Sequence, residues 1–462
     1  MRLERWFFGS LVYPAYHALA RDHVLGLTRE YEINQWKSTT EIQDLQSAKL
    51  AKLLQHAALH VPHYRQLFGV RGRLQSSTPH LSDWPRLTKA TIRTKPDSLI
   101  ATNIARTDLE PNSTSGSTGE PLYFYTDGRS SACRKASVIR NRRWAGIELG
   151  DREVRLWGSP LDKAQAQRLR GRVHGWLTRT LMLSAYDLSS ASLGRYLQVM
   201  RSYRPKLLIA YPSVLELLAG EMLRTGTQVE SLKAIIVSAE TLYPHQRDIF
   251  RTAFQAEVYN RYGSREVGDV AQECAVHDGL HINADRVVVE IVRDDLTPCA
   301  PGEVGEVLVT DLNNYGMPFI RYAIGDRAAV SRSSRCPCGR GLPLLAEVAG
   351  RSMDIIRFPN GVSVGGTYWT FLLRTKPGID QFQVVQEAPD EVQIRYVSQA
   401  EVAVDTLAFV ERDVRSRAGE NFRVRFKRVA DLPRGAGGKH RLVVNNLRSE
   451  EAVALTRSTD GR

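Results

Sequence analysis

The chain has 462 residues and a formal net charge of +13, from 63 Lys and Arg against 50 Asp and Glu. Hydrophobic residues make up 42% and charged residues 24%, which fits a folded protein of two or three domains and excludes wholesale disorder. The positive charge is scattered and the five cysteines are an odd number, so we expect a cytoplasmic protein that binds no nucleic acid and has no secreted disulfide framework.

The first part of the chain is predicted to be mainly helical. Residues 6–20 are apolar, but Pro14 interrupts them and they are too few to span a bilayer. We interpret this segment as a docked or interfacial amphipathic helix, with weak membrane-surface contact as the alternative. From Glu41 to Leu67 leucine and alanine recur at helical spacing, which predicts a helix there.

The middle of the chain is typical of an α/β fold. Three short apolar runs are predicted strands: Val154–Trp157, Leu207–Ala210 and Ala234–Val237. Two amphipathic stretches, Ser213–Leu223 and Pro244–Phe254, are predicted helices. This alternation predicts a parallel sheet.

The last third is predicted to be richer in strands. His281–Ile291 and Glu303–Thr310 indicate a β-rich subdomain after Gly279. Past Gly350 the pattern predicts a small α+β domain, made of strands Phe382–Gln386, Glu391–Val397 and Val424–Val429 and a helix Asp405–Arg417. We therefore expect a large N-terminal domain, residues 1–350, and a small C-terminal domain, residues 351–462.

A glycine- and hydroxyl-rich loop, Thr114-Ser-Gly-Ser-Thr-Gly-Glu-Pro121, is the sharpest local signal. Glycine allows backbone N–H groups to approach phosphate oxygens, and the hydroxyls add donors. The predicted phosphate-binding residues are Ser115, Gly116, Ser117, Thr118 and Gly119. No Gly-Lys-Ser/Thr ends the loop, so it is not a Walker A motif, and a plain surface turn is the alternative.

Two further segments combine a tyrosine or a turn with a carboxylate. In Tyr262-Gly263-Ser264-Arg265-Glu266, the tyrosine could lie against a planar base while Glu266 binds Mg²⁺ through oxygen. Asp326 follows Gly325 at the end of a predicted strand pair, a position suited to accept hydrogen bonds from ribose hydroxyls. A structural Tyr beside a salt-bridged Glu, and ordinary Gly-Asp turn chemistry, are the alternatives.

The remaining two segments suggest movement. Gly350-Arg351-Ser352-Met353-Asp354 lies where the composition changes and is a candidate hinge. Lys439 ends a glycine-rich loop near the C-terminus, from which a point cation could reach a carboxylate and a phosphate.

In this order the five segments resemble the acyl-adenylate-forming superfamily, and more narrowly its phenylacetate-CoA ligase and CapK-like branch. The helical start with Leu53-Leu54-Gln-His-Ala57 and the phrase Cys336-Pro-Cys338-Gly-Arg340 support that branch. The resemblance runs from about Glu41 to Asn446 and implies a large N-terminal α/β domain with a β-rich subdomain, plus a small mobile C-terminal α+β domain.

The resemblance also implies a role for each matched residue. It places ATP phosphates on 115–119, adenine along Ser238-Ala239-Glu240, and the base or substrate at Tyr262-Gly263-Ser264. It further assigns Mg²⁺ to Glu266, ribose hydroxyls to Asp326, the ribose and phosphate region to Arg351, the hinge to Asp354 and adenylation to Lys439. Lys427 is left open as an alternative to Lys439.

The activity implied is ATP-dependent activation of a carboxylic acid as an acyl-adenylate, followed by acyl transfer to a thiol such as coenzyme A. The alternatives are a CoA-independent acyl or aminoacyl transferase-type enzyme and, less favoured, a non-catalytic nucleotide-binding scaffold. Trp157 and Tyr211 are candidates for the acid pocket or for the core, and a homodimer is expected on frequency grounds.

A metal site is predicted from three cysteines and a histidine. Cys274, Cys336 and Cys338 with His281 would supply three thiolates and one imidazole, the ligand set of a closed structural zinc site. His277 is the alternative to His281. Because C-X-C is tighter than the usual spacing, free cysteines near a Gly-Arg turn remain the competing interpretation; the branch resemblance favours zinc.

Overall fold

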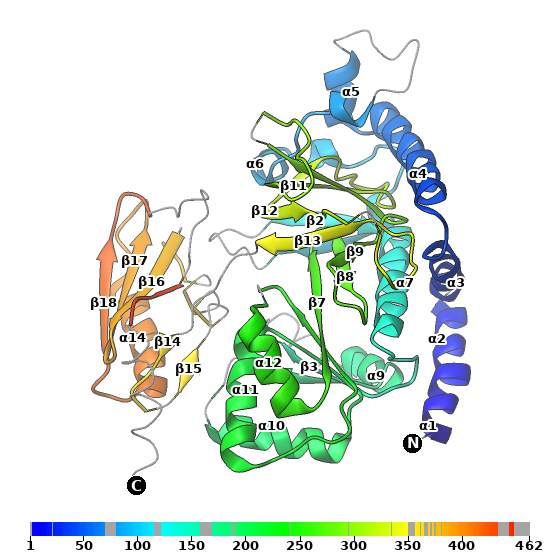
Figure 1. Ribbon diagram of the computed structural model, residues 1–462. Coiled ribbons are helices and arrows are strands. Elements are labelled where there is room, and N and C mark those ends of the chain that lie inside the picture. The colour runs from blue at the N-terminus through cyan, green and yellow to red at the C-terminus, as the bar shows by residue number, and fades with distance from the viewer. Residues whose placement is uncertain are drawn as a thin grey trace.

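We describe the fold from a computed structural model, shown in Figure 1. It describes residues 2–432 and 443–447, apart from 21, 70–79, 115–121, 158–168, 186, 187, 189, 241, 294, 334, 350–355, 361, 365–367, 370, 371, 374, 375 and 380. The predicted phosphate loop (115–119), the hinge (351–354) and Lys439 therefore lie outside the described residues.

The N-terminal part is helical, as predicted. Its elements are α1 (Arg2–Phe7), the π-helix η1 (Phe8–Val12), α2 (Tyr13–Ala20), α3 (Val24–Asn34), α4 (Thr39–His60), α5 (Pro62–Gly69) and α6 (Lys89–Thr94), with short 3-10 turns at Leu81–Asp83, Asp97–Leu99 and Arg106–Asp108. Helix α4 begins at a capping box in which Ser38 and Glu41 satisfy each other's backbone N–H groups. The helix predicted over Glu41–Leu67 is divided at Val61, because Pro62 has no N–H to continue the ladder.

A mixed sheet forms the centre of the large part. In sheet order its described strands are β10 (Val287–Val292), β11 (Val304–Asp311), β12 (Tyr322–Val330), β13 (Leu344–Ala349), β9 (Leu280–Ile282), β8 (Gly268–Glu273), β7 (Glu257–Ser264), β6 (Ala234–Ser238), β5 (Leu207–Ala210), β3 (Glu153–Trp157) and β4 (Thr180–Ser184). The strands from β7 to β4 are parallel, as the alternation predicts. The single strand predicted over His281–Ile291 is wrong, because a turn at Asn283–Arg286 divides it into β9 and β10.

Helices cover the parallel strands on both faces. They are α7 (Gly128–Trp144), α9 (Leu169–Leu177), α10 (Ser190–Tyr203), α11 (Pro212–Thr225) and α12 (Pro244–Phe254). Leu208 and Ile235 enter one buried cluster with the helices α10 to α12, while Leu207 and Ile236 enter another on the opposite face. Strands covered on both faces read as continuous apolar runs, which is why β5 and β6 could be recognised from the sequence.

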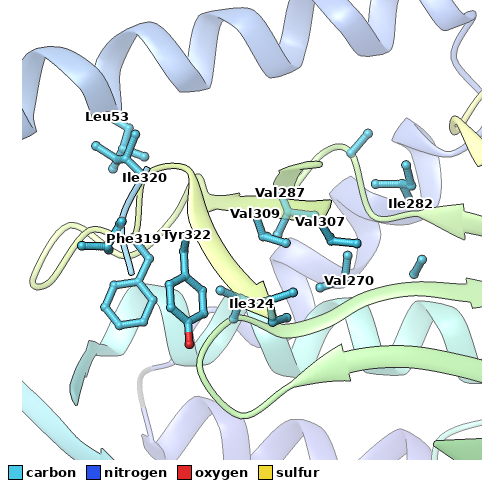
Figure 2. Close-up of a cluster of buried hydrophobic side chains, with 14 of the residues drawn as sticks. Leu53, Val270, Ile282, Val287, Val307, Val309, Phe319, Ile320, Tyr322 and Ile324 are labelled. Atoms are coloured by element: carbon cyan, nitrogen blue, oxygen red, sulfur yellow. The ribbon is translucent and has the colours of Figure 1, made fainter. Parts of the chain in front are cut away.

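A third buried cluster joins the helical start to the antiparallel strands. Figure 2 shows Leu53 of α4 near Ile320, and Phe319, Tyr322 and Ile324 along the chain that enters β12. Val307 and Val309 of β11 belong to the same cluster. Nearby, the hairpin of β1 (Leu109–Ser113) and β2 (Tyr123–Asp127) carries the ends of the predicted phosphate loop.

The C-terminal part has its own sheet and its own core. The sheet order is β18 (Arg423–Arg428), β17 (Glu391–Val397), β16 (Gln381–Ala388) and β19 (Val443–Asn445), with α14 (Val404–Ala418) and a small ribbon of β14 (Ile356–Arg357) and β15 (Ser363–Val364). Its cluster of buried residues includes Trp369, Phe382 and Val410. The predicted fold class, a large α/β part with a smaller α+β part, is confirmed (Figure 1). The boundary between residues 350 and 351 falls outside the described residues and stays a prediction.

Candidate active site

The carboxyl ends of β6 and β7 form the first edge of the site. Ser238, the last residue of β6, is buried and its Oγ donates to the carbonyl of Arg261 at 2.9 Å. Ala239 follows with φ of 72°, a left-handed conformation that turns the chain out of the sheet. Ligands of parallel sheets bind beyond the carboxyl ends of the strands, so the segment that contains Glu240 leaves the sheet where a ligand would enter.

Gly263 shapes the hairpin between β7 and β8. A Cβ on Gly263 would lie 2.5 Å from the carbonyl oxygen of Gly268, and the strand register shifts between Tyr262 and Gly263. Only glycine allows this close backbone approach. The hairpin therefore presents Tyr262 before the bend and Glu266 in the turn that follows it.

Glu266 is held by groups from two other elements. Its side chain is buried, and its Oε1 accepts a hydrogen bond of 2.8 Å from the hydroxyl of Tyr322 on β12. Its backbone carbonyl accepts a 2.6 Å bond from Arg134 of α7, whose guanidinium also pairs with Asp311 at 3.1 Å. Burial lowers the pKa of Arg134, and the neighbouring Asp311 opposes that effect. The turn is thus fixed by its backbone and by its carboxylate.

Asp326 lies inside β12, not in a turn at the end of a strand pair, so that part of the prediction is wrong. The pairing of β12 with β11 jumps from Ala323 opposite Leu308 to Arg327 opposite Glu306, and Gly325 has a φ of 90° within this bulge. Bulges re-aim side chains. Here the bulge brings Asp326 Oδ2 to 3.2 Å from the hydroxyl of Tyr262.

Two tyrosine–carboxylate contacts therefore join the β7–β8 hairpin to β12, although three strands lie between β7 and β12 in sheet order. The hairpin's Tyr262 donates to Asp326 of the strand, and the strand's Tyr322 donates to Glu266 of the hairpin. We call these four residues the carboxylate pair site. Its two carboxylates are the groups that the sequence assigned to ribose and to Mg²⁺.

The stem of the predicted phosphate loop is attached to the same hairpin. The Thr114 N–H donates to the Leu122 carbonyl at 2.9 Å, and the Leu122 N–H donates to Thr114 Oγ1 at 3.1 Å. Arg265, next to Glu266, donates to the carbonyl of Ser113 at 3.2 Å. Whatever residues 115–121 bind, their chain leaves and returns beside the turn that carries Glu266.

Trp157 and Tyr211 lie together at the carboxyl ends of the neighbouring parallel strands. Their rings stack with centroids 4.2 Å apart, and Tyr211 is 7% exposed. Trp157 ends β3, and Tyr211 follows β5 as the residue before α11. This stacked pair stays a candidate for a wall of the acid pocket.

The four predicted metal ligands do come together. The ligand atoms of Cys274, His281, Cys336 and Cys338 all lie within 4.8 Å of one another. The Cys274 and Cys336 sulfurs are 3.7 Å apart, and Cys338 Sγ is 3.3 Å from His281 Nε2. Tetrahedral zinc with Zn–S of about 2.3 Å requires sulfurs roughly 3.8 Å apart. The geometry fits that ion.

His281 is suited to be the fourth ligand, and His277 is not. His281 is fully buried, and burial lowers its pKa to about 4, so its imidazole is neutral. Its Nδ1 faces the Leu342 carbonyl at 3.4 Å, the outer contact that orients metal-binding histidines, while Nε2 faces the thiol. His277 instead contacts Glu273 at 3.0 Å and Glu257 at 3.4 Å.

Comparison with known proteins finds a matching domain family and relatives over most of the chain. The family described as the CapK C-terminal domain matches residues 361–446. The chain is 23% identical to protein CapK of Staphylococcus aureus over 430 residues, which cover 91% of this chain and 93% of that protein. It is 25% identical to phenylacetate-coenzyme A ligase of Thermus thermophilus over 440 residues, 88% of this chain and 96% of that enzyme.

The relatives named CapK and phenylacetate-coenzyme A ligase confirm the predicted resemblance to the acyl-adenylate-forming superfamily and to its phenylacetate-CoA ligase and CapK-like branch. A crystal structure of 2-hydroxyisobutyryl-CoA ligase in complex with 2-HIB-AMP and CoA has the same fold, with a TM-score of 0.63 at 19% identity, covering 93% of this chain and 94% of that one.

Sequence reasoning missed three residues of this site. Tyr322 was given no role, and Arg134 and Arg265 were not singled out. A tyrosine four residues before Asp326 was a usable signal for the first. No local pattern marks Arg134, because it acts from a helix more than a hundred residues away in the chain.

Proposed function

We propose that this protein activates a carboxylic acid with ATP to form an acyl-adenylate and then transfers the acyl group to a thiol such as coenzyme A. The carboxylate pair site carries the proposal, because a buried carboxylate (Glu266) and a half-buried one (Asp326), which have different expected roles, are fixed next to the stem of a glycine- and serine-rich loop. The full-length similarity to a phenylacetate-coenzyme A ligase supports the same reaction class.

The reaction needs orientation and charge neutralisation more than acid–base chemistry. An acid carboxylate oxygen bonds to the α-phosphorus of ATP and the bond to pyrophosphate breaks; a thiolate then bonds to the acyl carbon, and AMP leaves. Asp326 would accept hydrogen bonds from the ribose hydroxyls, which fixes the nucleotide. The segment from Ser238 to Glu240 would line the adenine, with Tyr262 beside the base or the substrate. Holding the reacting groups in place removes much of the entropic barrier.

Glu266 fits the expected magnesium ligand. Tyr322 uses only Oε1, and an ionised carboxylate offers about four lone-pair positions, so acceptor capacity remains. Mg²⁺, when bound, neutralises phosphate charge. Tyr322 and Arg134 keep the turn in one position, which limits where a cation and the phosphates attached to it can lie.

We further propose a structural zinc ion at Cys274, His281, Cys336 and Cys338. Cys274 directly follows β8, His281 lies in β9, and Cys336 and Cys338 lie in the loop before β13, so the ion would fasten the hairpin that carries Glu266 to the β-rich strands. Four protein ligands fill a tetrahedral zinc, and a closed site of this kind has no open position for a substrate. We therefore assign zinc no step in the reaction.

The hinge and the adenylating lysine stay proposals. Arg351 near the ribose, Asp354 as pivot and Lys439 as the cation for the first half-reaction follow from the family pattern. Lys439→Ala should abolish adenylation while acyl transfer from a supplied acyl-adenylate persists. Lys427→Ala is the matched control, because Lys427 is an exposed residue of β18. If the Lys427 variant instead loses adenylation, the assignment passes to Lys427.

Pyrophosphate exchange into ATP, measured with a panel of aryl, fatty and amino acids, tests the proposed reaction. Exchange with at least one acid, absent in Glu266→Gln, supports it. If the protein binds ATP but catalyses exchange with none of these acids, the result would favour the non-catalytic nucleotide-binding scaffold. Steady AMP release that requires coenzyme A then identifies the thiol as acceptor.

A second acceptor class has its own support. The match of residues 361–446 to the CapK C-terminal domain and the similarity to protein CapK, neither of which is named as a coenzyme A ligase, keep the CoA-independent acyl or aminoacyl transferase-type enzyme as the second candidate. AMP release with a non-thiol acceptor and without coenzyme A would establish it. A homodimer and a cytoplasmic location stay predictions.

A further inference from the structure

The N-terminal helices carry an apolar stripe on their outer face. Its members are spaced by about one helical turn and are exposed: Leu3 (83%), Trp6 (58%), Phe7 (48%), Leu11 (49%) and Leu19 (85%). Residues three and four apart share one face of a helix, and exposed Ala15 continues the series. We call these residues the apolar stripe. An exposed apolar surface of this extent marks an interaction site.

The other face of these helices packs on the turn before β3 and on α9, so the stripe cannot turn inward. A Cβ on Gly9 would collide with the carbonyl oxygen of Leu149, which shows how closely the helix approaches the turn at Glu148–Asp151. Phe8 meets Trp176 of α9 edge-to-face at 5.2 Å. Trp176 is itself 61% exposed and so extends the apolar surface beyond the stripe. Figure 1 shows α1 and α2 along the outer edge of the molecule with α9 close by.

A basic cavity lies beside the first turn of α1. Its charged lining consists of five basic and two acidic residues: Arg5, Arg152, Arg179, Arg204 and Lys206, with Glu4 and Asp151. Glu4 Oε2 pairs with both Arg152 and Arg179 at 3.0 Å. The net formal charge of the lining is therefore three positive units, five minus two.

The position of this cavity separates it from the active site. Arg152, Arg179 and Lys206 each immediately precede one of the parallel strands β3, β4 and β5. They lie at the amino ends of those strands, whereas Ser238 of the site and the candidate pocket residue Trp157 lie at the carboxyl ends of β6 and β3. A ligand in the cavity would leave the nucleotide site open.

We propose that this face docks on a membrane surface rich in anionic phospholipid. The apolar stripe enters the boundary between headgroups and acyl chains, and the basic cavity receives a lipid phosphate. Amphipathic helices with Trp, Phe and Leu on one face and flanking arginine lie in this plane of the bilayer. None of the described helices is long and apolar enough to cross it. A second copy of this chain would instead bring two positive cavities together.

Sedimentation with vesicles tests the docking. The full chain is mixed with vesicles of phosphatidylcholine alone, or with about a third phosphatidylglycerol, at low and at high salt. Binding is expected only to the anionic vesicles and should weaken as salt rises. The tryptophan fluorescence of the chain, to which Trp6 contributes, should shift to shorter wavelength on binding.

Variants separate the stripe from the cavity. A Trp6→Ser, Phe7→Ser double variant should bind at least about tenfold more weakly, because two large side chains no longer leave water. Arg204→Ala should weaken binding about fivefold. Leu223→Ser on α11, where Leu223 is 58% exposed, and Arg65→Ala on α5 are matched controls that should bind like the unchanged chain.

Three results would overturn the proposal. The first is equal sedimentation with neutral and anionic vesicles. The second is a loss of vesicle binding by Leu223→Ser as large as that of the stripe variant. The third is normal binding by the stripe variant together with complete competition by inorganic phosphate at constant ionic strength, which would mean that the cavity binds a soluble phosphate ligand. Since the stripe side chains are exposed, an unchanged melting temperature shows that the double variant is folded. ATP–pyrophosphate exchange without lipid should be unchanged, so failure of this proposal leaves the proposed reaction standing.

Discussion

Replacing Tyr322 with phenylalanine removes one hydroxyl from the carboxylate pair site and nothing else. That hydroxyl donates to the buried carboxylate of Glu266 at 2.8 Å. A hydrogen bond to a charged group contributes about 1.5–3 kcal/mol, about twice the usual value for a neutral pair. We expect Tyr322→Phe to lower the free energy of unfolding by about that amount.

Tyr64→Phe is the matched control for this loss. Tyr64 is also fully buried, belongs to the same hydrophobic cluster and donates to a neutral carbonyl, that of Pro318, at 3.1 Å. It should cost only about 0.5–1.5 kcal/mol. Both values are obtained from chemical denaturation with the same linear extrapolation.

Activity separates the two variants more sharply than stability does. Without the Tyr322 hydroxyl, Glu266 has lost one of the contacts that orient it. ATP–pyrophosphate exchange should therefore fall at least about tenfold and require more Mg²⁺. This is the effect expected when an outer contact of a metal ligand is removed. Tyr64→Phe should leave the magnesium dependence unchanged. A double-mutant cycle of Tyr322→Phe with Glu266→Gln measures the coupling directly. Equal stability losses, no coupling and an unchanged magnesium dependence would refute this reasoning.

The other predictions concern the ribose contact, the metal cluster and the hairpin. Asp326→Asn should raise the KM for ATP in pyrophosphate exchange, since an amide binds ribose hydroxyls less strongly than a carboxylate; an unchanged KM would remove Asp326 from the site. Cys336→Ser should reduce the bound zinc, measured by elemental analysis of the purified protein, and should lower the melting temperature. Cys299→Ser is the control and should keep one zinc per chain. Equal metal content in both variants would contradict the proposed zinc site. Gly263→Ala should destabilise the protein by about 1–3 kcal/mol in denaturant unfolding, because the added Cβ meets the Gly268 carbonyl at 2.5 Å. Gly220→Ala on α11, where an added Cβ would meet nothing within 4 Å, should be neutral or stabilising; destabilisation by both changes alike would show that close approach is not the cause.

The elements of this fold could be predicted where local signals were strong. The helix Pro244–Phe254 and the strand Glu391–Val397 have the predicted bounds, because Pro244, the turn residues Pro389 and Asp390, and regular apolar spacing define them within a few residues. The prediction of a single strand over His281–Ile291 was wrong because the valines of β10 and the apolar residues of β9 form one apparently continuous apolar run in the sequence. Asn283 and Arg286 end that run through buried tertiary contacts, which leave no local signature.

The sequence by itself determined the order of the chemical groups along the chain, the α/β class and the set of possible metal ligands. The tertiary structure decided which of them meet. It joined Tyr322 to Glu266 and Tyr262 to Asp326, and it placed His281, not His277, among the cysteines. The reason is physical: spacing along one helix or strand fixes only which residues share a face, whereas contacts between distant segments depend on a bulge at Gly325, a close approach at Gly263 and the packing of a shared core.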